Sequence, residues 1–282
     1  MSTPNQIAKE ILQNGKAAVV VGYCEGTIPG RTQTHFAKTP EQAEKFIFSK
    51  SCVNNLAIYL TKQYKLPKPI GIFLKPCDIK TVVSLIQEKQ IKRDDVFVIG
   101  LTCEGVYKGK DELAGKCKTC TSHNPKDYDI IIGEPVEEPA TDPAMKFARL
   151  KTIESMPIEQ RRDFWTKEFD KCIRCYACRQ ACPLCYCEQC IVDKTQPRWI
   201  ESSAHPVGNL GWHLIRAFHL AGRCIGCGEC ERACHQNIPL GLLNMKMTKE
   251  IFEEFEYMAG VDAEAKPPLT DYKMEDDESF IR

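Results

Sequence analysis

Cysteine is the residue type that offers the most chemistry in this chain. Four cysteines in the run 172–183 have the spacing C-x2-C-x2-C-x3-C-P. This spacing is typical of bacterial two-cluster ferredoxins, in which three cysteines bind one 4Fe–4S cluster and the fourth binds the other cluster. The spacing recurs in the run 224–234, which is followed by His235 instead of proline. The repeat indicates an internal duplication.

The crossed ligation of such modules divides the eight cysteines into two predicted ligand sets. The first set is Cys172, Cys175, Cys178 and Cys234. The second set is Cys182, Cys224, Cys227 and Cys230. Zinc is the alternative metal, but zinc sites favour pairs of cysteines separated by a longer gap. We therefore predict two 4Fe–4S clusters.

Four further cysteines form a predicted third set: Cys77, Cys103, Cys117 and Cys120. Cys77 and Cys103 each come just past a predicted strand, and ligands of open parallel sheets bind beyond the carboxyl ends of the strands. The pair Cys117 and Cys120 has C-x2-C spacing and completes a set of four. We predict a third 4Fe–4S cluster here, with Cys24 as the substitute if one ligand is wrong. The alternative is two core cysteines and a loop pair, with or without zinc.

The helix after Cys77 gives the third set a further feature. We expect Asp78 to cap this helix, whose first amide groups then face the negative charge of the cluster. Cys52 is expected to be a buried small residue. His213 and His219 lack the spacing of a ligand pair, and we expect them in the core or in solvent.

Three more cysteines, Cys185, Cys187 and Cys190, directly follow the first motif. They form either a further metal site or spare thiols beside the clusters. A metal site would take its fourth ligand from elsewhere in the chain, and the candidates are Cys24, Cys52 and His205.

Composition narrows the class of protein. The 282 residues include 38 basic and 38 acidic side chains, so the chain lacks the basic surplus of a nucleic-acid-binding protein. No stretch reaches the roughly 18–20 apolar residues of a membrane span, and the first residues lack an apolar signal region. With 17 cysteines, this pattern predicts a cytoplasmic protein with reduced thiols in an oxygen-poor cell.

The pattern of apolar residues predicts an α/β fold with a small parallel sheet of about four strands in the N-terminal half. The predicted strands cover 17–23, 69–74, 95–101 and 128–133. The predicted helices of this half cover 41–48, 52–62 and 78–90. An elaborated two-cluster ferredoxin domain with extra helices is expected to follow.

The chain divides into three expected parts. Residues 1–138 form the α/β domain, 139–260 the ferredoxin domain, and 261–282 a disordered tail or an arm that docks on a partner. The acidic, proline-rich stretch 134–143 is the expected linker. Helices are predicted over 158–169, 209–221 and 240–258. The apolar residues that share one face of the second of these are Leu210, Leu214, Ala217, Phe218 and Ala221.

Several motifs together resemble a known family. The segments 74–78 (LKPCD) and 100–104 (GLTCE), and Cys117 and Cys120 leading to 129–133 (DIIIG), resemble beta subunits of deazaflavin-coenzyme hydrogenases and dehydrogenases, which include formate dehydrogenase beta subunits. The run 182–190 is similar to iron–sulfur subunits beside formate dehydrogenases and heterodisulfide-reductase-like complexes. The resemblance implies an electron-relay subunit of a multi-subunit complex and supports a cluster at the third set.

The resemblance also bears on whether the chain binds a flavin. Family members bind FAD and carry a glycine-rich segment before the first strand, whereas residues 1–15 of this chain lack those glycines. We therefore expect an oxidoreductase subunit that passes electrons without catalytic residues of its own and without FAD. The first alternative is a flavin-containing subunit that exchanges hydride with a deazaflavin or nicotinamide coenzyme. The second is a redox sensor or a zinc-stabilised binding module.

Overall fold

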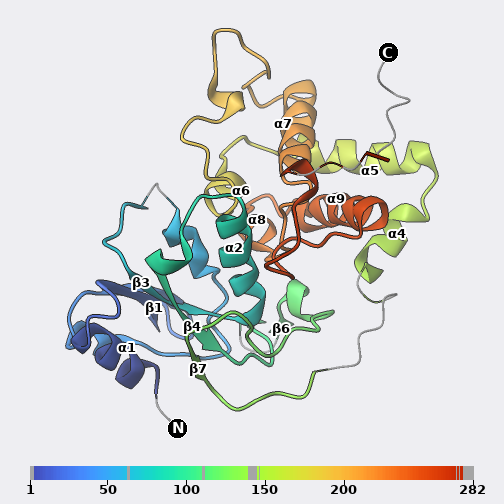
Figure 1. Ribbon diagram of the computed structural model, residues 1–282. Coiled ribbons are helices and arrows are strands. Elements are labelled where there is room, and N and C mark those ends of the chain that lie inside the picture. Colours follow the sequence, from blue (N-terminus) through green and yellow to red (C-terminus); the bar gives the residue numbers. More distant parts are fainter. Residues whose placement is uncertain are drawn as a thin grey trace.

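The chain has a mixed α/β architecture, with a five-stranded sheet in its N-terminal half and helices in its cysteine-rich C-terminal half (Figure 1). The computed structural model describes residues 3–61, 64–109, 112–138, 145, 147–270, 272 and 274–275. Within this described part, no helix is both long and apolar enough to cross a membrane.

The sheet has the strand order β2-β1-β3-β4-β7. Its strands are β1 (Val19–Glu25), β2 (Thr32–Ala37), β3 (Ile70–Leu74), β4 (Val96–Leu101) and β7 (Ile130–Ile132). β1, β3, β4 and β7 are parallel to one another, and β2 pairs antiparallel with β1 at one edge. The three inner strands are almost entirely buried and apolar, as expected for a sheet covered on both faces. The predicted parallel sheet is confirmed.

Two helices cover the sheet, α1 (Pro4–Gln13) and α2 (Pro76–Gln87). α1 buries Ile7 and Ile11, while α2 buries Ile79, Val82 and Leu85 in the same core. α2 lies between the sheet and the C-terminal helices (Figure 1). A small hairpin, β5 (Tyr107–Lys108) with β6 (Glu112–Leu113), follows β4.

Three expectations for this half are wrong. The predicted helices 41–48 and 52–62 are short 3-10 turns, η1 (Gln42–Lys45) and η2 (Leu56–Leu60). After η1 the chain becomes extended, and the Ile47 N–H donates to the Tyr23 carbonyl of β1 at 2.9 Å, so sheet pairing replaces the helix. β2 was not expected, because this half-exposed edge strand is largely polar.

The C-terminal half is built from helices around the cysteine motifs. These helices are α4 (Lys151–Glu154), α5 (Ile158–Asp170), α6 (Ala177–Gln180), α7 (Pro206–His219), α8 (Glu229–Arg232) and α9 (Leu240–Phe255). Short 3-10 turns in this half are η6 (Ala148–Leu150), η7 (Ile191–Asp193) and η8 (Pro268–Thr270). The N-terminal half has two more, η4 (Arg93–Asp95) and η5 (Gly115–Cys117). Phe169, Trp212, Ile238 and Leu240 form a second core that includes Cys178 and Cys230.

α7 turns most of its predicted apolar face outward, although Ala217 of that face is buried. Val207 is 73% exposed and Phe218 60%, and Leu210 and Leu214 lie exposed on the same side. The buried side instead carries polar residues that donate to carbonyl groups of the cysteine motif. Asn209 Nδ2 lies 2.9 Å from the Cys172 carbonyl, and Arg216 Nη2 lies 3.1 Å from the Cys178 carbonyl. Buried carbonyls need donors, and this requirement sets the orientation of α7.

The two halves share one core and several polar contacts. Leu184 and Leu220 of the cysteine-rich half are buried in the core of the sheet domain. Arg223 Nε lies 2.5 Å from a carboxylate oxygen of Glu88, just after α2. Residues 257–265 pack along α2, where Gln87 donates to carbonyls of Asp262, Ala263 and Ala265. Of the predicted linker, residues 139–143 lie outside the described residues, as do 271, 273 and 276–282 of the tail.

Candidate metal centre

The two cysteine motifs fold in the same way. In the first motif, the residues two and four positions after Cys172 have left-handed backbone, Arg174 at φ 57° and Tyr176 at φ 58°. In the second motif, the equivalent positions after Cys224 are glycines at φ 72°. A four-residue helix, α6 or α8, follows in each motif. The internal repeat in the sequence is therefore also a repeat in the backbone.

The structure brings the fourth cysteine of each motif to the other motif. Cys182 lines one cavity of about 510 Å³ together with the three other members of the second set, Cys224, Cys227 and Cys230. Cys234 lies close enough to Cys172 and Cys178 to influence the pKa of both thiols. This placement is the arrangement that crossed ligation requires.

The third set lies against the second. Cys77, Cys117 and Cys120 line the same 510 Å³ cavity as the second set, and Cys103 lies near Cys77 and Cys117, where the charges of these thiols interact. Cys24 lines neither this cavity nor the smaller one described below, and its thiol donates to the Glu25 carbonyl instead.

Asp78 does not cap α2, so that expectation is wrong. The helix begins at Pro76 with Lys75 as its N-cap, and Asp78 lies inside the first turn. Its carboxylate instead pairs with the Lys75 ammonium at 2.6 Å, and both side chains are fully buried. Cys77 still lies at the N-terminal end of α2, as expected.

Backbone N–H groups donate to cysteine sulfurs in all three sets. In five cases the donor lies two residues after the cysteine: Arg174 to Cys172, Gly226 to Cys224, Glu229 to Cys227, Gly105 to Cys103 and Ser122 to Cys120. The Arg174 nitrogen is 3.4 Å from the Cys172 sulfur. Hydrogen bonds to sulfur stabilise thiolates and tune the potentials of clusters. The donor set and its surroundings therefore fit iron–sulfur clusters.

Burial makes these thiols hard to ionise without a cation. It raises the pKa of Cys77 and of Cys230 to about 12 and that of Cys178 to about 11. A metal ligand must be a thiolate. The sites therefore need positive charge close by, from the metal and from the protein.

Arg216 on α7 supplies such a charge between the first and second sets. Its guanidinium is buried, and burial alone would lower its pKa. The nearby sulfurs of Cys182, Cys230, Cys185 and Cys178 outweigh that effect and raise it. Its Nε atom has no hydrogen-bond partner among the described residues. A buried, partly unpaired arginine that faces both sets is matched to negative charge on both.

Lys75 and Lys116 supply positive charge beside Cys77 of the third set. Lys75 is held by the Tyr23 hydroxyl at 2.6 Å and the Asn54 carbonyl at 2.8 Å, in addition to Asp78. Lys116 lines the cavity beside Gly228 of the second motif. Burial opposes its charge, but the thiol of Cys77 and the carboxylate of Asp78 raise its pKa.

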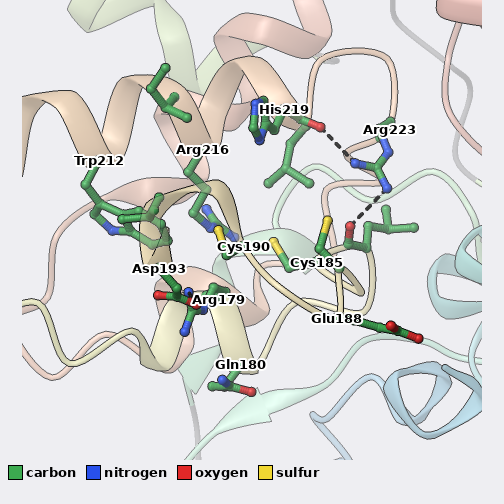
Figure 2. Close-up of a pocket in the computed structure, with 15 residues that line it drawn as sticks. Arg179, Gln180, Cys185, Glu188, Cys190, Asp193, Trp212, Arg216, His219 and Arg223 are labelled. Atoms are coloured by element: carbon green, nitrogen blue, oxygen red, sulfur yellow. Dashed lines mark hydrogen bonds and ion pairs between the residues drawn. The ribbon is translucent and has the colours of Figure 1, made fainter. Parts of the chain in front are cut away.

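The cysteines of the 185–190 loop line a cavity of their own, although Cys185 contacts Cys182 of the second set. Cys185, Cys187 and Cys190 line a space of about 130 Å³ together with residues of α7 (Figure 2). None of the expected fourth ligands joins them. Cys24 and Cys52 belong to the sheet domain, and the His205 ring accepts from the Gly208 N–H at the start of α7.

Sequence reasoning missed the buried cations. The burial of Lys75 could have been predicted from its position, because a lysine directly after an apolar strand is buried unless the chain turns. The burial of Arg216 could not, since an arginine in an amphipathic helix is normally exposed. His213 is in the core as expected, stacked on Phe169 with ring centroids 4.6 Å apart. Burial, with Arg216 and Arg174 nearby, lowers its pKa to about 4.

Comparisons with known proteins agree with the family resemblance. A beta subunit of F420-dependent formate dehydrogenase from Methanocaldococcus jannaschii is 27% identical over 74% of this chain and 78% of the relative. The beta subunit of F420-dependent formate dehydrogenase 1 from Methanococcus maripaludis is 24% identical over the same shares. The chain is thus a distant homologue of these beta subunits, and the resemblance seen in the motifs is confirmed.

Other comparisons add less. A chain of the F420-reducing NiFe hydrogenase complex from Methanosarcina barkeri is 20% identical, with a TM-score of 0.30 over 37% of this chain and 38% of that one. No protein-family model matches the chain.

The buried ion pair at the start of α2 gives a stability prediction. Lys75→Met leaves the Asp78 carboxylate without its closest cation in a fully buried site, and we expect a loss of about 3–5 kcal/mol in the free energy of unfolding. The control is Lys68→Met, which removes the exposed ion pair with Asp95 and is expected to cost at most about 1 kcal/mol. Urea denaturation followed by circular dichroism measures both. Equal losses in the two variants would contradict the assigned role of Lys75.

Proposed function

We propose that this chain is an electron-transfer subunit of a multi-subunit oxidoreductase in the cytoplasm of an anaerobic cell. Three 4Fe–4S clusters, one for each cysteine set, carry the electrons, and the substrate chemistry takes place on a partner subunit. The observation that supports this best is the shared cavity, in which cysteines of the second and third sets face one space. The three parts 1–138, 139–260 and 261–282 would be the sheet domain, the ferredoxin domain and the tail.

The arrangement of the sets supports a linear relay. The first set and the second set meet at α6 and α8, with Arg216 between them. The second and third sets meet across the shared cavity, where Lys116 approaches Gly228. Iron–sulfur clusters accept and donate single electrons, so a series of three moves electrons one at a time between the ferredoxin domain and the sheet edge.

The protein contributes positive charge and N–H dipoles. A 4Fe–4S cluster with four thiolates carries net negative charge, and reduction adds one more. Arg216, Lys116 and the N–H groups aimed at sulfur offset this charge in a buried site. Each of these groups stabilises the reduced state and thereby raises the reduction potential.

The first set is the point at which a partner subunit would exchange electrons. Cys175 is exposed, and so is its neighbour Ile173. Arg174 between them donates to the Gly208 carbonyl of α7 at 2.7 Å, so the exposed apolar face of α7 begins beside this loop. An exposed apolar face of this kind is typical of a protein–protein interface. The relatives are named as subunits, and this chain would likewise work inside a complex.

A flavin-containing subunit is the second candidate, and the names of the relatives favour it. Both are beta subunits of F420-dependent enzymes. Such a subunit would need a two-electron cofactor in addition to its clusters, because a deazaflavin exchanges hydride. A flavin absorption band in the anaerobically purified chain would move this candidate to first place.

The ligand sets predict iron content directly. The intact chain, purified without oxygen, should contain at least about twelve iron and twelve sulfide atoms. Cys175→Ala, Cys227→Ala and Cys117→Ala should each contain about four fewer, because each removes a ligand of a different set. Cys52→Ala is the control, since this buried cysteine lines neither cavity. Iron content that is the same in all four variants would rule out the relay.

Arg216 predicts a change in potential. Arg216→Gln removes the buried charge that faces both ferredoxin sets, so the reduction potentials of both clusters should fall. Arg216→Lys keeps a positive charge and should lower these potentials less. Redox titration followed by electron paramagnetic resonance measures the potentials, and the iron content shows that the clusters remain. Potentials unchanged in Arg216→Gln would mean that this residue only supports the fold.

A further inference from the structure

The loop between α6 and η7 gathers three thiols at one small cavity. Cys185, Cys187 and Cys190 line a space of about 130 Å³ that is closed on the other side by α7 (Figure 2). The loop reaches this position because Leu184 is buried in the core of the sheet domain and Val192 in the second core. Both ends of the loop are therefore fixed by packing.

Three arginines surround these thiols. Arg179, Arg216 and Arg223 all line the cavity. Arg179 makes a hydrogen bond with the sulfur of Cys190, and Arg223 lies near Cys185. Figure 2 shows Arg216 reaching from α7 to the side of the cavity where Cys190 lies. These arginines place positive charge and N–H donors beside the three thiols.

Nearby carboxylates pair with two of these arginines and leave Arg216 without such a partner among the described residues. Asp193 is bound by Arg179 at 2.7 Å, and Glu188 points away from the labelled cysteines in Figure 2. Glu88 pairs with Arg223 from outside the cavity, and two donors of Arg223 also reach the carbonyls of Leu184 and His219. Arg216 has no carboxylate partner among the ion pairs of the described residues.

The thiols of this loop do not converge on one point as the ligands of a single zinc ion do. In a zinc site all ligand atoms converge to about 2.0–2.3 Å from one centre. In the part of the chain that the structure describes, no three cysteine, histidine or carboxylate side chains converge closely enough to hold one ion. The ferredoxin-motif cysteines do not converge in that sense either, and four of them, Cys182, Cys224, Cys227 and Cys230, line the larger cavity. A cavity of about 130 Å³ is several times the roughly 30 Å³ that one water occupies.

We propose that Cys185, Cys187 and Cys190 bind a fourth 4Fe–4S cluster, with His219 as its fourth ligand. This proposal deepens the proposed function and rests on it. Apart from the three cysteines and the two carboxylates already discussed, His219 is the remaining described residue of ligand type that lines the cavity, at the exposed end of α7. Its ring lies on the C-terminal end of α7, one turn beyond Arg216 (Figure 2).

The fourth site would adjoin the second set. The thiols of Cys182 and Cys185 are hydrogen-bonded to each other, although Cys182 faces the large cavity and Cys185 the small one. The two clusters would therefore have neighbouring ligand sulfurs at Cys182 and Cys185. The relay would branch at the second set instead of running in a single line.

The test is the metal content of ligand variants purified and reconstituted with iron and sulfide under anaerobic conditions. The intact chain should contain about sixteen iron atoms, and Cys187→Ala and Cys190→Ala about twelve each. His219→Ala should retain the cluster but change its electron paramagnetic resonance spectrum, because a nitrogen ligand is lost. Cys187 is exposed, so its truncation should leave the fold intact, and circular dichroism of both cysteine variants checks this.

The control is Cys24→Ala, which alters a thiol remote from both cavities and should keep the iron of the intact chain. Iron content unchanged in both Cys187→Ala and Cys190→Ala would overturn the fourth cluster. Zinc that is present in the intact chain and lost in these variants would also overturn it. In either case Cys227→Ala would still lose iron if the proposed function holds, so the two failures are distinguishable.

Discussion

Negative charge inside a folded protein is the constraint on which this structure depends. The chain buries many of its cysteine sulfurs in or beside its two cores, and burial raises the pKa of most of these thiols. Thiolates in such surroundings require nearby cations or hydrogen-bond donors. Lys75, Lys116 and Arg216 are buried or nearly buried cations beside the cysteines, and each is costly unless negative charge is present. The buried cations therefore explain how the cysteine sets can carry negative charge, and that negative charge explains why the cations can be buried.

The same constraint explains how the two halves are joined. α2 starts at the third set and ends where Glu88 binds Arg223 of the cysteine-rich half. Its outer side is covered by residues 257–265, where Gly260 packs so closely on the Lys80 carbonyl that a side chain could not fit. One helix thus fixes the sheet edge against the second motif. In the proposed relay this rigid contact keeps the second and third clusters at a constant separation.

The sequence predicted those parts that depend on local pattern. Apolar runs identified β1, β3, β4 and β7, and cysteine spacing placed Cys182 with the second motif before any contact was known. Features that depend on tertiary contacts were missed. β2 is polar because it forms an edge, and α7 exposes Phe218 because its polar side satisfies carbonyls of the motif loops. Arg216 is recognisable as a buried cation only after the sets are seen around it.

Magnetic coupling between clusters tests the central claim most directly. The claim is that the second and third sets hold clusters that face one cavity, which makes them immediate neighbours. In the fully reduced protein, the account predicts an electron paramagnetic resonance spectrum split by spin interaction between these clusters. The splitting should simplify in Cys117→Ala, which removes a ligand of the third set only. A fully reduced spectrum without interaction, or one that Cys117→Ala leaves unchanged, would contradict the account.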